Sequence, residues 1–176
     1  EGVAGPARQS ASKVSAALLE KIKQHSSGRI LKLTSILPSN DVLKLFAALS
    51  TNRSTCSLDL EGCGIGDAGC EALAALLCAN KRVQELDLQM NQISDVGASA
   101  LAAALPASGV QQLLLARNHI SVEGATVLAR ATLEQHRLTG QCASLSGIPD
   151  GLVAQVAASA AASAQQSGGA GGAGGP

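Results

Sequence analysis

Four carboxylates in the middle of the chain have the spacing best suited to chemistry. Asp59 and Glu61 stand two residues apart, and Glu85 and Asp87 repeat this spacing further along. Paired carboxylates serve general acid–base catalysis when a substrate pocket and a proton-transfer partner accompany them. The segments around these residues contain neither a companion histidine, an aromatic residue nor a nucleophile motif. We therefore predict no catalytic residues and a protein that is not an enzyme.

The cysteines are a second group that could carry chemistry. Zinc ligands usually come in close pairs separated by two to four residues, whereas these are widely spaced: Cys56, Cys63, Cys70, Cys78 and Cys142. Their odd number does not fit a disulfide framework, and a reducing compartment explains them more simply. The glycine-rich stretch at 62–66 lacks the Lys-Ser/Thr that a phosphate-binding loop needs. We predict no metal, no cofactor, no small-molecule substrate, and a cytoplasmic or other reducing intracellular location.

Composition narrows the possible partners. Lysine and arginine number 13, and aspartate and glutamate also number 13, so the formal net charge is zero. A broadly basic surface for nucleic acid is therefore not expected, and aromatic residues on which bases stack make up only 1% of the chain. No apolar run reaches the roughly 20 residues that span a bilayer, so membrane insertion is not expected. Other proteins remain as partners.

A repeat organises the residues around the carboxylates. Three segments share the pattern L-x-L-x-x-(N/C)-x-I: they begin at Leu58, Leu86 and Leu113. The offsets are 86 − 58 = 28 and 113 − 86 = 27 residues, which is the period of a leucine-rich repeat. Each segment is followed by a glycine and an apolar helical stretch; these glycines are Gly69, Gly97 and Gly124. The pattern predicts a short inward-facing strand, a turn and a helix in each repeat.

These repeats resemble the ribonuclease-inhibitor-like class of leucine-rich repeats, with the specific match running from Thr55 to Ala131. The class includes ribonuclease inhibitor, the sensor ends of NOD-like receptors and the Ran GTPase-activating proteins. The resemblance implies an α/β solenoid, a short right-handed horseshoe arc with parallel strands on the concave side and helices on the convex side. It also implies a ladder of turn residues, here Cys63, Asn91 and Asn118, and ligand binding on the concave face.

The same register divides the chain into units. We predict a solenoid over 29–137. Its first repeat is degenerate, with a helix that begins at an N-cap in Ser39-Asn40-Asp41. The clear repeats carry apolar stripes along their helices, and the last stripe contains Val127 and Leu128. Leu138 is assigned to the closing unit. The full division is a flexible N-terminus at 1–9, a capping helix at 10–28, repeats at 29–54, 55–82, 83–109 and 110–137, a truncated repeat or cap at 138–162, and a disordered Gly/Ala tail at 163–176.

Alternation along each strand identifies the side chains that the solenoid leaves outside. Because the leucines point inward, the residues before, between and after them point outward. The predicted protein-binding residues on the concave face are Asp59, Glu61, Glu85, Asp87, Gln89, Gln112, Leu114 and Arg117. Lys32 is expected to border the acidic group on one side and Arg117 on the other. The alternative interpretation is a charged face that only keeps the protein soluble.

The predicted function is a non-catalytic protein–protein interaction module, a subunit or accessory scaffold of a multiprotein complex that binds through the concave strand face. A basic segment of a partner protein fits the acidic group. The alternatives are a regulator resembling the Ran GTPase-activating proteins, a ligand-sensing fragment resembling a NOD-like receptor, and an architectural role in which the convex helices pack into a complex.

Overall fold

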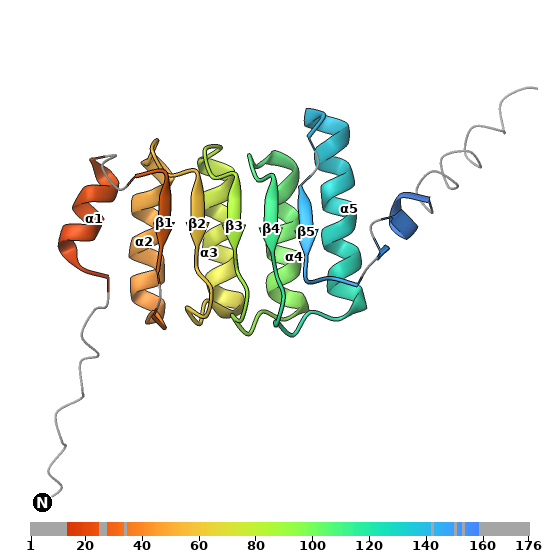
Figure 1. The fold of residues 1–176 in the computed structure, drawn as a ribbon, viewed down its shortest axis with the longest axis horizontal. Coiled ribbons are helices and arrows are strands. Elements are labelled where there is room, and N and C mark those ends of the chain that lie inside the picture. The colour runs from red at the N-terminus through yellow and green to blue at the C-terminus, as the bar shows by residue number, and fades with distance from the viewer. Residues whose placement is uncertain are drawn as a thin grey trace, which may run out of the picture.

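The computed structural model describes residues 14–24, 28–33, 35–141, 143–149, 151–152 and 154–158. Five short strands form one parallel sheet in chain order: β1 (Ile30–Lys32), β2 (Ser57–Asp59), β3 (Glu85–Asp87), β4 (Gln112–Leu114) and β5 (Ser144–Ser146). The helices are α1 (Ala16–Lys23), α2 (Ser39–Thr51), α3 (Gly66–Ala79), α4 (Asp95–Ala104), the short 3-10 helix η1 (Leu105–Ala107) and α5 (Val122–Thr139). Helices α2 to α5 lie side by side along one face of the sheet (Figure 1). This arrangement confirms the α/β leucine-rich-repeat solenoid.

Rows of leucines join the two layers. The central residues of the five strands pair in register, and the first four of them are buried: Leu31, Leu58, Leu86, Leu113 and Leu145. Leu31 lies beside Leu58, as the 27-residue spacing predicts for the strand of the first repeat. Because side chains alternate along a strand, the residues on either side of this row lie on the opposite face of the sheet. We call that face, turned away from the helices, the concave face.

The turns after the strands carry the predicted ladder, which we call the turn ladder (Cys63, Asn91 and Asn118). The amide of Asn91 donates to the carbonyls of Leu60 at 2.7 Å and Gln89 at 3.0 Å. Asn118 donates in the same way to Leu88 and Leu115, both at 2.8 Å. Cys63 places its sulfur 3.4 Å from the Leu33 carbonyl oxygen. Each ladder residue thus reaches the preceding repeat, which confirms the predicted role.

A second ladder, which the sequence pattern did not predict, runs along the opposite ends of the helices. We call it the helix-end ladder (Asn52, Asn80, Ser108 and Gln135). Asn80 donates to the carbonyls of Leu49 at 2.7 Å and Asn52 at 2.9 Å, and Gln135 donates to that of Val110 at 2.9 Å. The members are at most 7% exposed. A buried carbonyl without a donor is costly, so Asn52 and Asn80 secure the junctions to their preceding units. The Ser108 hydroxyl instead bonds locally, to the carbonyl of Leu105 at 2.8 Å.

Serine residues cap the starts of α4 and α5, whereas the start of α2 differs from the sequence prediction. The hydroxyl oxygens of Ser94 and Ser121 accept the backbone N–H groups of Val96 and Glu123, as N-caps do. The predicted cap in Ser39-Asn40-Asp41 is wrong, because Pro38 holds the N-cap position of α2 and Ser39 is already helical. Asp41 has another role: the residue is 2% exposed, and its carboxylate accepts the N–H of Val14 at 3.3 Å. That carboxylate ties the chain before α1 to α2.

The helix glycines make room for the preceding helix. Asp67 in the first turn of α3 accepts the backbone N–H of Ser94 at 2.8 Å, its hydroxyl at 2.6 Å and the N–H of Gly97 at 3.0 Å. A side-chain carbon on Gly97 would stand 2.5 Å from this carboxylate, and one on Gly124 would meet Asp95 in the same way. Gly97 and Gly124 thus admit the carboxylate of the preceding repeat, whereas a side-chain carbon on Gly69 would meet Ile65 of its own repeat.

The C-terminal repeat differs from the expectation in two side chains. Val127 is 40% exposed, whereas its neighbour Leu128 is fully buried, because adjacent helix residues point about 100° apart. Leu138 belongs to α5 and is 57% exposed, so it does not join the closing unit. The helical residues at 152 and 154–158 place Leu152 and Val156 against α5, as a closing helix should.

Some sequence predictions concern residues outside this description. They include the N-terminus at 1–9, the first residues of the helix expected from 10, and the tail at 163–176. Helix α5 crosses residue 137, where the last clear repeat was expected to end. The division of the chain into units stays a prediction.

A candidate protein-binding surface on the concave face

Two rows of outward-facing side chains cross the strands of the concave face. The register aligns one row at the strand starts: Ile30, Ser57, Glu85, Gln112 and Ser144. It aligns a second row at the strand ends: Lys32, Asp59, Asp87, Leu114 and Ser146. Neighbouring strands in a sheet lie about 4.8 Å apart, so charges in one row are close together.

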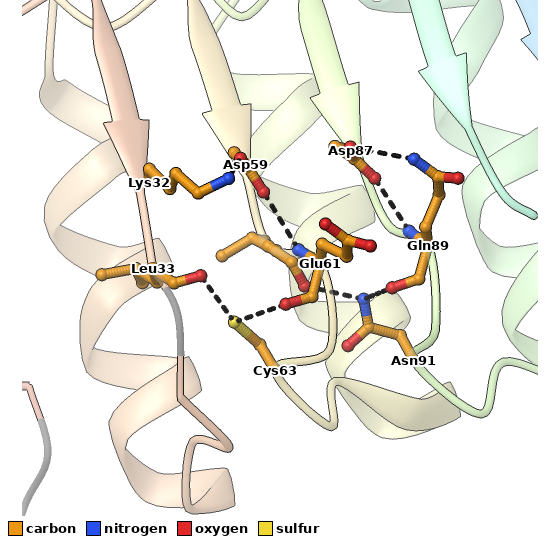
Figure 2. A network of polar contacts seen from close by, with 9 residues as sticks. Lys32, Leu33, Asp59, Glu61, Cys63, Asp87, Gln89 and Asn91 are labelled. Carbon is orange, nitrogen blue, oxygen red and sulfur yellow. Dashed lines mark hydrogen bonds and ion pairs between the residues drawn. The ribbon is translucent and has the colours of Figure 1, made fainter.

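Three carboxylates meet at the ends of β2 and β3. Oxygen atoms of Asp59, Glu61 and Asp87 all lie within 4.8 Å of one another. Figure 2 shows Lys32 reaching from β1 toward Asp59, with its ammonium nitrogen 2.5 Å from Oδ2 of that residue. The other oxygen of Asp59 accepts the backbone N–H of Glu61 at 3.2 Å. We call these three carboxylates with Glu85 and Lys32 the acidic patch.

Asp87 is satisfied by its own strand end. Its Oδ1 accepts the backbone N–H of Gln89 at 3.0 Å, and its Oδ2 accepts the Gln89 side-chain amide at 3.1 Å (Figure 2). The Asp87 carboxylate is half-buried, whereas Glu61 and Glu85 are exposed. The patch thus combines two carboxylates that have partners, Asp59 and Asp87, with two that extend into solvent.

The electrostatic field of the patch acts on Lys32. Its hydrogen bond to Asp59, followed by the charge of that carboxylate, raises the pKa of the Lys32 ammonium above its ordinary value of 10.5. Glu61 and Asp87 add to this effect through their charges. Four carboxylates against one ammonium leave the patch negative, which favours a cationic ligand.

Two shallow hollows adjoin the patch and share Asp59. One, of about 160 Å³, has acidic walls formed by Asp59, Glu85 and Asp87 and apolar walls that include Ile30 and Leu114. The other, of about 300 Å³, is lined by Lys32, Leu33, Asp59, Glu61, Gly62 and Met90. Carboxylates beside apolar side chains suit a long basic side chain, whose alkyl stem is apolar and whose head is charged.

The structure places most of the predicted residues at this surface. Gln89 lies at the patch through its bonds to Asp87, Glu85 and Gln112 stand in the row at the strand starts, and Leu114 stands in the row at the strand ends. Arg117 differs, because it lies in the turn with a backbone φ of +58° and contacts the sulfur of Met90 at 3.8 Å. It does not pair with the carboxylates.

Sequence reasoning missed two features of this surface. Ile30 and Met90 are exposed by 67% and 46%, and they supply the apolar walls of the two hollows. The sequence prediction also placed Lys32 only at the border of the acidic group, although Lys32 bonds directly to Asp59. The signal was present, since Lys32 precedes Asp59 by 27 residues, the period that aligns β1 with β2.

The cysteines that the structure describes do not contribute to this surface. These residues, Cys56, Cys63, Cys70 and Cys78, are free thiols. Burial raises the pKa of Cys70 to about 12 and also raises that of Cys63. Such thiols stay protonated near neutral pH and are poor nucleophiles or metal ligands.

The strands, leucine rows and turn ladder together define a leucine-rich-repeat solenoid. Two stretches, residues 57–74 and 79–102, match the family model of the leucine rich repeat. No helix among the described residues combines the length and apolar character needed to cross a membrane.

Comparison with solved structures supports this fold. Among solved structures, the chain is similar to Leiomodin-1 Actin-Binding Site 2 (ABS2), with a TM-score of 0.67 and 19% sequence identity. The likeness covers 87% of this chain and 96% of that one. A search of curated protein sequences gives no match. At 19% sequence identity, this likeness concerns the fold alone.

Proposed function

We propose that this protein is a non-catalytic interaction module that binds a basic segment of a partner protein through its concave face. Supporting this, the sheet face turned away from the helices presents two rows of side chains that the solenoid does not need for its core. A preformed strand face binds without first having to become ordered, which lowers the cost of association.

The acidic patch is the observation that carries the proposal. Like charges placed side by side on neighbouring strands destabilise a sheet. Here the carboxylates of Asp59, Glu61 and Asp87 converge within 4.8 Å, beside a hollow with both acidic and apolar walls. A partner lysine or arginine would relieve this repulsion and bury its stem against Leu114.

We extend the proposal to the class and setting of the protein. The helices α3, α4 and α5 each exceed nine residues, which supports the ribonuclease-inhibitor-like class of repeat. The four described free thiols support a reducing compartment. We further propose that the protein acts as a subunit or accessory scaffold of a multiprotein complex. The GTPase-activating and ligand-sensing alternatives stay predictions.

Affinity purification from the native source tests the proposed surface. The bait carrying Asp59→Lys together with Asp87→Lys should lose partners that the unaltered bait captures. A control bait with Glu71→Lys and Glu134→Lys, on α3 and α5, undergoes the same change in charge away from the concave face. Circular dichroism and thermal unfolding establish that each bait is folded. Equal capture by all three folded baits would rule out the concave patch as the binding surface.

Actin is a second candidate partner, favoured by the likeness across 96% of Leiomodin-1 Actin-Binding Site 2. Co-sedimentation with actin filaments and fluorescence anisotropy with monomeric actin test it directly. Binding to either form that is lost in Asp59→Lys with Asp87→Lys would identify actin as a ligand of this face. Absence of binding to both forms would exclude actin and leave the general interaction proposal intact.

A further inference from the structure

Lys32 is the cation already seated on the acidic patch. Its ammonium lies 2.5 Å from the Asp59 carboxylate, and its side chain is 57% exposed, whereas that of Asp59 is 21% exposed. An exposed lysine side chain has many rotamers, and an exposed ion pair holds it only weakly. Lys32 can therefore leave Asp59 by side-chain rotation while β1 stays in place.

Asp59 is accessible from two sides. Lys32 approaches it from the hollow lined also by Leu33 and Glu61. The second hollow reaches the same carboxylate from the β3 and β4 side, past Glu85 and Leu114. A basic side chain entering this second hollow would meet Asp59 while Lys32 still occupies it.

The remaining carboxylates show what Lys32 leaves unfilled. The side chains of Glu61 and Glu85 have no hydrogen bond or ion pair with other residues that the structure describes, and the carboxylate of Asp87 bonds only to Gln89. One ammonium thus neutralises one of four carboxylates. The patch accepts an amine in the free protein and retains negative charge for another cation.

We propose that Lys32 is a built-in competitor, whose ammonium holds the Asp59 carboxylate in the free protein and gives it up to an arginine or lysine of the partner. This inference rests on the proposed function of the concave face. Lys32 then lowers the affinity for weakly basic segments, and segments with closely spaced basic residues displace it. Removing its charge should strengthen binding.

Titration with a fluorescein-labelled hexa-arginine peptide tests this competition. Lys32→Gln should bind the peptide about two- to five-fold more tightly than the unaltered protein, the range expected for an exposed ion pair. Lys23→Gln is the matched control, since Lys23 pairs with Glu20 at 3.0 Å on α1, away from the patch, and its removal changes the net charge equally. It should leave the affinity unchanged.

A double-mutant cycle shows whether the gain passes through Asp59. Asp59→Asn should weaken binding, and Lys32→Gln should bring no further gain in the Asp59→Asn protein. Two outcomes overturn the competitor role alone. One is an equal gain in affinity from Lys32→Gln and Lys23→Gln. The other is no gain from Lys32→Gln while Asp59→Asn and Glu85→Gln still weaken binding. Peptide binding that is absent, or that needs neither Asp59 nor Glu85, overturns the proposed function and the competitor role with it.

Discussion

The helix-end ladder and the acidic patch are both rows of polar side chains that repeat once per turn of the solenoid, but they lie in opposite environments. Asn52 and Asn80 are fully buried and bond to carbonyls of the preceding unit. Asp59 and Asp87 stand on the concave face, and their side chains bond to Lys32 and Gln89 at the protein surface. Buried polar groups must be paired to keep the fold, whereas exposed ones are free to serve a ligand.

The largest effect is expected at Asn80. Asn80→Ala removes the donors to Leu49 and Asn52 and the acceptor for the N–H of Arg82. Because these groups are buried at the junction of two repeats, we expect a loss of about 3 kcal/mol in the free energy of unfolding, measured with urea. Asn40→Ala, on the exposed first turn of α2, should change it by less than about 0.5 kcal/mol. Equal losses would show that burial does not distinguish the two sites.

The two ladders also differ in how much of them the sequence reveals. The turn ladder repeats Asn or Cys at a fixed distance after the paired leucines, so Cys63, Asn91 and Asn118 were predicted with their role. The helix-end ladder uses different residue types, because Asn80 and Gln135 donate to distant carbonyls whereas Ser108 donates to Leu105 of its own helix end. A pattern of residue types cannot show such a position.

The candidate site was predictable to the same extent as the strands. Alternation around Leu58 and Leu86 fixed which carboxylates face outward, and their spacing fixed that they meet. The exposure of Ile30 follows from its place beside the inward-facing Leu31 in β1, whereas the contact of Arg117 with Met90 depends on the turn geometry. The period carries no information about that geometry.

The carboxylate of Asp67 lies between the two extremes, half-buried between α3 and α4. Its hydrogen bonds from the Ser94 hydroxyl, and then from the backbone N–H groups of Ser94 and Gly97, lower its pKa below the ordinary 3.8. The folded protein thus favours the ionised form, so this carboxylate stabilises the fold above about pH 4 and the contribution is lost as the pH falls through the folded pKa. Asp67→Asn should cost about 1 kcal/mol at pH 7.

Urea unfolding of both proteins from pH 7 to pH 2 measures this contribution. The difference between the unaltered protein and Asp67→Asn should shrink below about pH 4. Glu71→Gln, on the exposed side of the same helix, serves as the control and should show no such difference. A gap between the proteins that stays constant with pH would mean that ionisation of Asp67 does not stabilise the junction.

A smaller effect, of opposite sign, is expected at Arg117. Arg117 and Met90 hold positive φ values of +58°, at the position where the first clear repeat has Gly62. Arg117→Gly removes the strain of the left-handed conformation, and the greater entropy that glycine loses on folding offsets part of this gain. We therefore expect a net stabilisation of about 0.5 kcal/mol. Ala116→Gly, next to it without a positive φ, should destabilise it. Thermal unfolding of the two variants compares them, and a loss of stability in both would show that the contact with Met90 outweighs the strain.

The smallest change in stability is expected at Asp87, where function should respond instead. Asp87→Asn keeps an oxygen for the backbone N–H of Gln89 and loses only the part-buried bond from the Gln89 side-chain amide. We expect the free energy of unfolding to change by less than about 0.5 kcal/mol, while binding of the hexa-arginine peptide weakens. Asp67→Asn makes the same chemical change at a repeat junction. It should have the reverse effect, reducing the stability of the fold without weakening peptide binding. If Asp87→Asn destabilised the fold as much as Asp67→Asn, the concave carboxylates would belong to the scaffold, and their exposure would not indicate a binding surface.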